Sequence, residues 1–329
     1  MQNLPRQRSA TAIRRAAQGE SSRTILIALL ANVVIAVAKV IAGVVSGSSA
    51  MLAEAAHSAA DSVNEVLLAI SLRRDRAPAD ATHPMGHGRE RFLWAFMAAI
   101  ASFLIGGCVS IAIAVRELGS HHPMHGALVA WIVLAVSLVA EGASWLQSMR
   151  QARNQASEYG LPVWRYLIRA SDPVVRAIVV EDSAALIGLC LAAAGLLASE
   201  VLGTNVPDSV ASLLIGVLLA VTAFGLARPL ADFLVGRSLP PTQLETLYAM
   251  VKKDPAVHEI VSLRALYIGP EEVVVIAKVH PAPTLNIEQL TEAMDDLDAR
   301  IRAALPLVAD IFIDVTTHRT EPDREGQPA

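Results

Sequence analysis

Six apolar segments dominate this chain of 329 residues, and they constrain its fold more than any other feature. Each has the length of about 20 residues that a helix needs to cross the hydrocarbon core of a bilayer. They lie at residues 24–46, 49–72, 92–115, 126–149, 174–198 and 208–228. Because 53% of the residues are hydrophobic and only 18% are charged, the composition also predicts an integral membrane protein in a lipid bilayer. The net charge of −4 lacks the basicity of a nucleic-acid-binding protein, so we expect no nucleic-acid partner.

Arginine residues gather on one side of these six predicted spans. The N-terminal arm, the second-to-third connection and the fourth-to-fifth connection each carry several arginines, whereas the alternate connections offer only Arg116. By the positive-inside rule, both termini are expected in the cytoplasm. The short loops and alanine-rich spans favour a bacterial inner membrane.

The character of the sequence changes to that of a soluble domain after residue 238. Its patterns alternate as helix, strand, strand, helix and strand, which predicts a small α+β module. The predicted organisation is therefore a cytoplasmic arm (1–23), a six-helix membrane domain (24–237), a cytoplasmic α+β domain (238–318) and a disordered tail (319–329).

The second span carries a stripe of ionisable residues. Glu54, His57 and Asp61 are spaced by three and four residues, so they share one face of a helix. Each such group costs about 2.5–3.5 kcal/mol at the centre of a bilayer. A divalent cation is one compensating partner, because imidazole and carboxylate groups are ligands that Zn²⁺ prefers.

Further ionisable residues interrupt the other spans. Glu181 and Asp182 are adjacent in the fifth span, and since neighbours on a helix point about 100° apart, only one of them can face the second span squarely. The fourth span contains Glu141, and the first contains Lys39. An alternative without metal is internal pairing for packing, for example of Lys39 with Glu54 or with Glu141.

Three motifs together resemble the cation diffusion facilitator family of divalent-metal transporters. They are "SGSSAMLAEAAHSAADSV", "DATHPMGHGRERF" and "PDSVASLLIGVLL". The resemblance implies that His57 and Asp61 form the second-helix half of a transport site and that Asp182 contributes from the fifth helix. The other fifth-helix ligand of the family falls on Ile178, which cannot bind metal, so Glu54, Glu181, Glu141 or a water is left to complete the shell.

The resemblance implies a second metal site and a dimer. Asp80, His83 and His87 match the family's site in the loop after the second helix, where a carboxylate and two imidazoles on a turn suit zinc. The terminal domain is implied to be ferredoxin-like and to form a homodimer. Its family zinc site is not expected to be complete, because Leu290 and Asp314 stand at positions that are often histidine.

The sequence therefore predicts a secondary transporter that exports Zn²⁺ or a similar divalent cation from the cytosol in exchange for protons. The zinc ion is expected as the transported substrate and as a structural ion, and Mn²⁺, Fe²⁺, Co²⁺ and Ni²⁺ remain alternatives. A metal sensor or scaffold anchored by its spans is a second class. A membrane metalloenzyme is a third, but the spans contain no His-Glu-x-x-His motif and we expect no enzyme activity.

Overall fold

The computed structural model describes residues 29–30, 32–75, 77–118, 127–158, 162–164, 167, 173–270 and 272–316. The predicted N-terminal arm (1–23) and tail (319–329) lie outside these ranges. The chain divides into two compact units, one comprising Met1–Ile70 with Trp94–Arg228 and the other Ser71–Leu93 with Pro229–Ala329. The first unit is a helical bundle, and the second contains a β-sheet.

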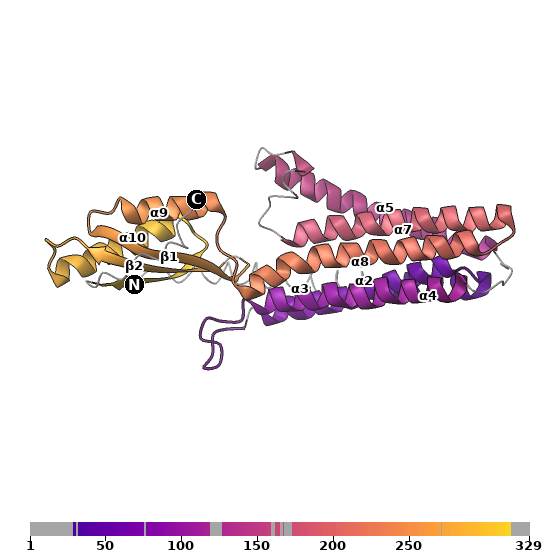
Figure 1. The fold of residues 1–329 in the computed structure, drawn as a ribbon, viewed down its shortest axis with the longest axis horizontal. Coiled ribbons are helices and arrows are strands. Elements are labelled where there is room, and N and C mark those ends of the chain that lie inside the picture. Colours follow the sequence, from indigo (N-terminus) through magenta and orange to yellow (C-terminus); the bar gives the residue numbers. More distant parts are fainter. Residues whose placement is uncertain are drawn as a thin grey trace, which may run out of the picture. The chain divides into compact units, whose positions relative to one another are not determined.

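The described parts of the predicted apolar segments are helical, and Figure 1 labels most of these helices. In chain order they are Asn32–Ser46, α2 (Ser49–Arg74), the continuous run α3 (Glu90–Ala101), η1 (Ser102–Cys108) and α4 (Val109–Leu118), then α5 (Ala127–Glu158), α7 (Pro173–Leu202) and α8 (Val206–Val235). Within the described ranges, four helices, those from Glu90 onward, are long and apolar enough to cross a membrane. The polar residues of α2 lower its hydropathy. The protein is thus an integral membrane protein with several transmembrane helices.

A buried acid on α8 joins it to the start of α2. The carboxylate of Asp208 accepts hydrogen bonds from the hydroxyls of Ser48 (2.7 Å) and Ser49 (2.9 Å) and from the backbone N–H of Ala50 (3.1 Å). Ser48 in turn accepts from the N–H of Met51 at 3.1 Å, as an N-cap residue does. Two of the N–H groups that the start of α2 would leave unpaired, those of Ala50 and Met51, are therefore satisfied, one of them by another helix.

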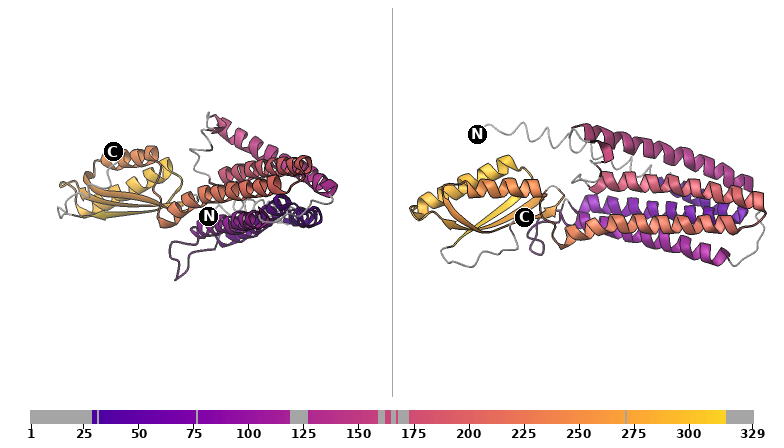
Figure 2. Two further views of the ribbon diagram at one scale, coloured as in Figure 1. Left: turned by 45° about the vertical axis from the view of Figure 1, so that its right-hand side comes forward. Right: turned by 45° about the horizontal axis from the view of Figure 1, so that its top comes forward.

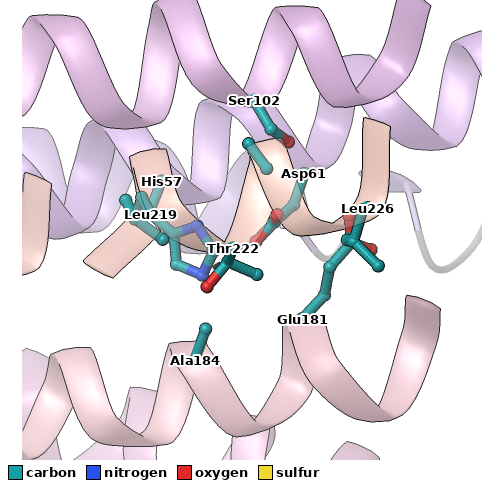
Figure 3. A pocket seen from close by; sticks show the side chains of 9 residues that line it. His57, Asp61, Ser102, Glu181, Ala184, Leu219, Thr222 and Leu226 are labelled. Carbon is teal, nitrogen blue, oxygen red and sulfur yellow. Dashed lines mark ion pairs between the residues drawn. The ribbon is translucent and has the colours of Figure 1, made fainter. Parts of the chain in front are cut away.

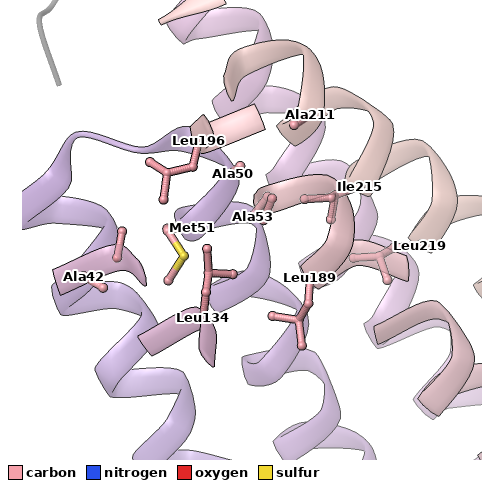
Figure 4. Close-up of a cluster of buried hydrophobic side chains, with 12 residues drawn as sticks. Ala42, Ala50, Met51, Ala53, Leu134, Leu189, Leu196, Ala211, Ile215 and Leu219 are labelled. Carbon is pink, nitrogen blue, oxygen red and sulfur yellow. The ribbon is translucent and has the colours of Figure 1, made fainter. Parts of the chain in front are cut away.

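The core of the bundle consists of small and medium apolar side chains from five helices (Figure 4). Alanines such as Ala50 and Ala53 on α2 let neighbouring helices approach closely, and Met51, Leu189 and Ile215 fill the remaining space. This packing brings α2, α7 and α8 together, and these helices carry the polar groups described below.

The second unit contains the predicted order of helix, strand, strand, helix and strand. These elements are α9 (Pro241–Lys252), β1 (Val257–Gly269), β2 (Glu272–Pro281), α10 (Ile287–Ala304) and β3 (Val308–Val315). The sheet order is β1-β2-β3, with β1 and β2 antiparallel and β2 and β3 parallel. Both helices cover one face of the sheet (Figure 2), where Leu247 and Leu297 are fully buried. The helical membrane domain is thus followed by a C-terminal α/β domain.

Candidate metal centres

A small cavity lies between helices α2, η1, α7 and α8 of the bundle (Figure 3). Its polar lining consists of His57 and Asp61 from α2, Ser102 from η1, Glu181 from α7 and Thr222 from α8. Apolar side chains close the rest of the wall, namely Ala184, Leu219, Ala223 and Leu226. An imidazole and two carboxylates therefore converge from two helices on one space that is otherwise apolar.

The imidazole of His57 has an unused donor atom in this cavity. The side chain is 6% exposed, and its Nε2 lies 3.6 Å from Oδ2 of Asp61, beyond hydrogen-bond distance. Nε2 has no hydrogen-bond partner among the described residues. A buried polar atom without a partner is unfavourable, so this nitrogen is available for a ligand that the cavity admits.

The two adjacent acids of the fifth span face different neighbours. Glu181 lines the cavity, whereas Asp182 accepts hydrogen bonds from Ser144 on α5, with both oxygens at 3.4 Å from the hydroxyl. Asp182 was expected to face Asp61, but it does not line the cavity. The physical reason is the angle of about 100° between successive side chains on a helix.

The sequence analysis missed Asn64, which holds Glu181 in place, and Ser102, which binds Asn64. The Nδ2 of Asn64 on α2 donates to Oε1 of Glu181 at 3.3 Å and to the hydroxyl of Ser102 at 2.7 Å. Asn64 lies seven residues after His57, so its position on the same helix face was a signal in the sequence. Ser102 begins the π-helical segment η1, and such segments recur at functional sites.

Glu54 lies outside the cavity, although the sequence made it a candidate ligand. Its Oε2 forms an ion pair with Lys39 at 3.1 Å, and both side chains are fully buried. Its Oε1 points to Gly188 on α7, where the first atom of any side chain would lie only 2.3 Å from that oxygen. The pairing of Lys39 with Glu54, which the sequence analysis left as an alternative, is thus present.

A second cluster forms in the loop between α2 and α3. Asp80, His83 and His87 each offer one ligand atom, and these atoms lie within 4.8 Å of one another. Oδ2 of Asp80 lies 3.1 Å from Nε2 of His87, and Oδ1 lies 3.4 Å from Nδ1 of His83. The donor set of one carboxylate and two imidazoles fits zinc, and the predicted triplet is brought together.

Hydrogen bonds hold this loop cluster in shape. Oδ1 of Asp80 accepts from the hydroxyl of Thr82 (2.6 Å) and from the backbone N–H groups of Thr82 (2.8 Å) and His83 (2.7 Å). These bonds, with that from His87, hold the pKa of Asp80 well below its usual range. The carboxylate is therefore ionised and ready to bind a cation at neutral pH.

Glu90 orients the ring of His87, and the sequence analysis did not identify it. Its Oε1 lies 2.7 Å from Nδ1 of His87, and this contact, followed by that with Asp80, raises the pKa of His87. A carboxylate on one ring nitrogen favours the tautomer that leaves Nε2 free for a metal. The spacing of three residues along the chain was the signal for this pair.

Two glycines shape the loop around His87. Gly86 has a φ of 79°, a left-handed conformation that other residues rarely adopt. Gly88 packs so closely on the end of β1 that an added Cβ would lie 2.8 Å from the carbonyl oxygen of Ile268. The loop and the end of the β1–β2 hairpin are therefore fitted to each other within the second unit.

Comparison with known proteins points to one family. The family model described as the cation efflux transmembrane domain matches residues 25–235. Metal tolerance protein C4 of Arabidopsis thaliana is 31% identical over 76% of this chain and 55% of its own length. The proton-coupled zinc antiporter SLC30A9, mitochondrial, of Xenopus laevis is 31% identical over 76% of this chain and 45% of its own length. The manganese efflux system protein MneP of Bacillus subtilis is 28% identical over 74% of this chain and 79% of its own length. The chain thus spans about half the length of the first two relatives.

Proposed function

The chain belongs to the cation efflux family, and from that premise we propose that it exports a divalent cation from the cytosol in exchange for protons. The prediction of a transporter rather than an enzyme is confirmed by the family match. The observation that carries the proposal is the cavity where the unpartnered Nε2 of His57 faces the carboxylates of Asp61 and Glu181.

The donors of this cavity suit a transported ion better than a permanently held one. One imidazole nitrogen and two carboxylates supply three protein ligands, which leaves a position of a tetrahedral shell open for water. In our proposal Glu181 takes the fifth-helix role that the family motif gave to Asp182 and Ile178. Glu54 stays with Lys39 and does not bind the ion.

Proton exchange follows from the chemistry of these ligands. His57 must be neutral and the carboxylates ionised to bind a cation, so metal binding releases protons and a fall in pH weakens it. With the cavity open to the cytosol, the ligands take up the ion. When the cavity opens on the other side, protons displace the ion and return with the empty carrier, as in alternating access around a midplane site.

Zn²⁺ is the cargo that we propose, since a mixed nitrogen and oxygen site suits it, but Mn²⁺ is the nearest competitor because Glu181 makes the site richer in oxygen. The similar proteins include one named for zinc and one named for manganese. Competition between Zn²⁺, Mn²⁺, Fe²⁺ and Co²⁺ for uptake by proteoliposomes will rank them.

The test of the transport site is metal flux into proteoliposomes that contain the full chain. Flux should vanish in Asp61→Ala and Glu181→Ala and persist in Asp182→Ala, which serves as the matched control on the same helix turn. Flux lost in Asp182→Ala but kept in Glu181→Ala would return the fifth-helix role to Asp182. Metal binding without any flux in the parent protein would favour the sensor alternative.

Further predictions about topology, the C-terminal domain and the loop cluster belong to this proposal. The distribution of arginines supports cytoplasmic termini, and the short loops support a bacterial inner membrane. The element order of the C-terminal domain supports the ferredoxin-like class, and we propose that this domain forms the contact of a homodimer. We also propose that Asp80, His83 and His87 hold a structural zinc ion.

A further inference from the structure

A buried lysine lies among acids from two other helices, outside the metal cavity. The ammonium nitrogen of Lys39 is 3.1 Å from Oε2 of Glu54 on α2 and 3.8 Å from Oε1 of Glu141 on α5. It also donates a hydrogen bond to Ser58 at 2.9 Å. Lys39, Glu54 and Glu141 are termed the lysine triad below, and none of them lines the cavity.

The charges of the lysine triad do not balance when both acids are ionised. One ammonium then faces two carboxylates, and the side chains of Lys39 and Glu54 are 0% exposed while that of Glu141 is 17% exposed. An uncompensated charge in such a place is strongly unfavourable. One proton bound to either carboxylate makes the triad neutral.

We infer that the lysine triad is a proton-binding site separate from the metal cavity, and that it releases its proton when a divalent cation enters the cavity. The proton forms an O–H bond with Glu141 while Lys39 stays paired with the closer Glu54. When the O–H bond breaks, the proton passes to water and the ammonium is shared by both carboxylates. The second half of this inference rests on the proposed function.

The position of the triad couples it to the cavity. Glu54 lies one helical turn before His57 on α2, and the charges that act on Glu141 are those of Lys39, Asp61, His57 and Glu54. On α7, Gly188 faces Glu54, while Glu181 and Asp182 are engaged by Asn64 and Ser144. A cation beside His57 and Asp61 adds positive charge close to Glu141, which stabilises its ionised form.

The experiment counts the protons that Zn²⁺ displaces from the full chain in detergent. Every protein compared carries Asp80→Ala, so that the cavity and not the loop cluster binds the ion, and the parent is the chain with that change alone. Calorimetric titrations in buffers of different ionisation enthalpy give this number. Glu141→Gln and Glu54→Gln each leave one ammonium with one carboxylate, so neither variant needs a shared proton. Each should release about one proton fewer per Zn²⁺ than the parent. Glu200→Gln is the control, because this acid near the end of α7 bonds to Trp131 and is remote from the triad, and it should release the parental number.

The outcomes separate this inference from the proposed function. If the parent binds Zn²⁺ and both glutamine variants release as many protons as the parent, the lysine triad binds no proton, and the transport proposal is unaffected. If the parent binds no Zn²⁺, the proposed function fails. The triad is then tested by infrared spectra of the metal-free protein, in which both variants should lose intensity from a protonated carboxyl band that Glu200→Gln retains. An unchanged band in both variants would overturn the inference.

Discussion

The intramembrane cavity and the loop cluster offer similar ligands in different surroundings. Both combine imidazole with carboxylate, but the Nε2 of His57 is unpartnered and lies 3.6 Å from Asp61, whereas the Nε2 of His87 lies 3.1 Å from Asp80. In the loop, the ligands are held by further hydrogen bonds. Thr82 and the backbone N–H of His83 bond to Asp80, and Glu90 bonds to His87. In the cavity, the described residues give His57 no such support on Nε2.

This difference matches two different tasks. A transport site must release its ion once in each cycle, so ligands that relax apart without the ion are an advantage. A structural site benefits when its ligands are oriented before binding, because less order is lost on capture. We therefore expect the loop cluster to bind a metal ion more tightly and to exchange it more slowly than the cavity.

The largest expected effect is the loss of metal flux when the cavity alone is altered. Asp61→Asn keeps the size of the side chain but removes the charge and one proton-exchanging ligand, so metal flux into proteoliposomes should fall at least about 100-fold. Zn²⁺ should still bind at the loop cluster with its parental affinity. A variant with flux close to that of the parent would contradict the cavity as the transport site.

The next largest effect is the loss of Zn²⁺ affinity when the loop cluster alone is altered. Asp80→Ala removes the carboxylate that contacts both histidines, and affinity for the tightly bound Zn²⁺ should fall by about 100-fold. Co²⁺ in place of Zn²⁺ gives a visible absorption signal for this site, and the signal should be lost. Flux should fall far less than in Asp61→Asn, and an equal fall would mean that the two sites do not have separate tasks.

Local patterns in the sequence predicted most residues of both sites. The sequence did not reveal contacts between segments that are distant along the chain. Helical periodicity placed His57 and Asp61 on one face, and the turn residues brought Asp80 and His87 together. The choice between Glu181 and Asp182 depends on how α7 is rotated against α5, where Ser144 binds Asp182. That rotation is set by packing between helices, which no spacing within α7 reveals.

A smaller effect concerns the pH at which the loop cluster loses its metal. The contact with Glu90 raises the pKa of His87, so protons compete for this ring at a higher pH than for an ordinary histidine. The affinity of the loop cluster for Zn²⁺ has its full value above the raised pKa of His87 and falls as the pH drops through that pKa. In Glu90→Gln the pKa should return toward its usual value, and the loss of metal should move to lower pH.

The measurement is Zn²⁺ affinity across a pH series in the Asp61→Asn background, where the loop cluster is observed by itself. At high pH, Glu90→Gln should bind about tenfold more weakly than its parent, because the ring of His87 is no longer oriented by a carboxylate. The two affinity curves should converge as the pH falls. Parallel curves would show that Glu90 orients the ring without changing its proton affinity.

The smallest expected effect concerns the hydrogen bonds that hold Glu181 in the cavity. Ser102→Ala removes one of the two acceptors of Asn64, whose amide also holds Glu181. Loss of one hydrogen bond of about 1 kcal/mol predicts a fivefold weaker affinity for the transported ion. Glu181 keeps its charge in this variant, so the maximal flux should change little. The metal concentration that gives half-maximal flux should rise. Ser102→Thr retains the hydroxyl and should restore the parental value. If Ser102→Ala instead abolished flux as Asp61→Asn does, Ser102 would be a ligand of the ion itself and not a support behind Asn64 and Glu181.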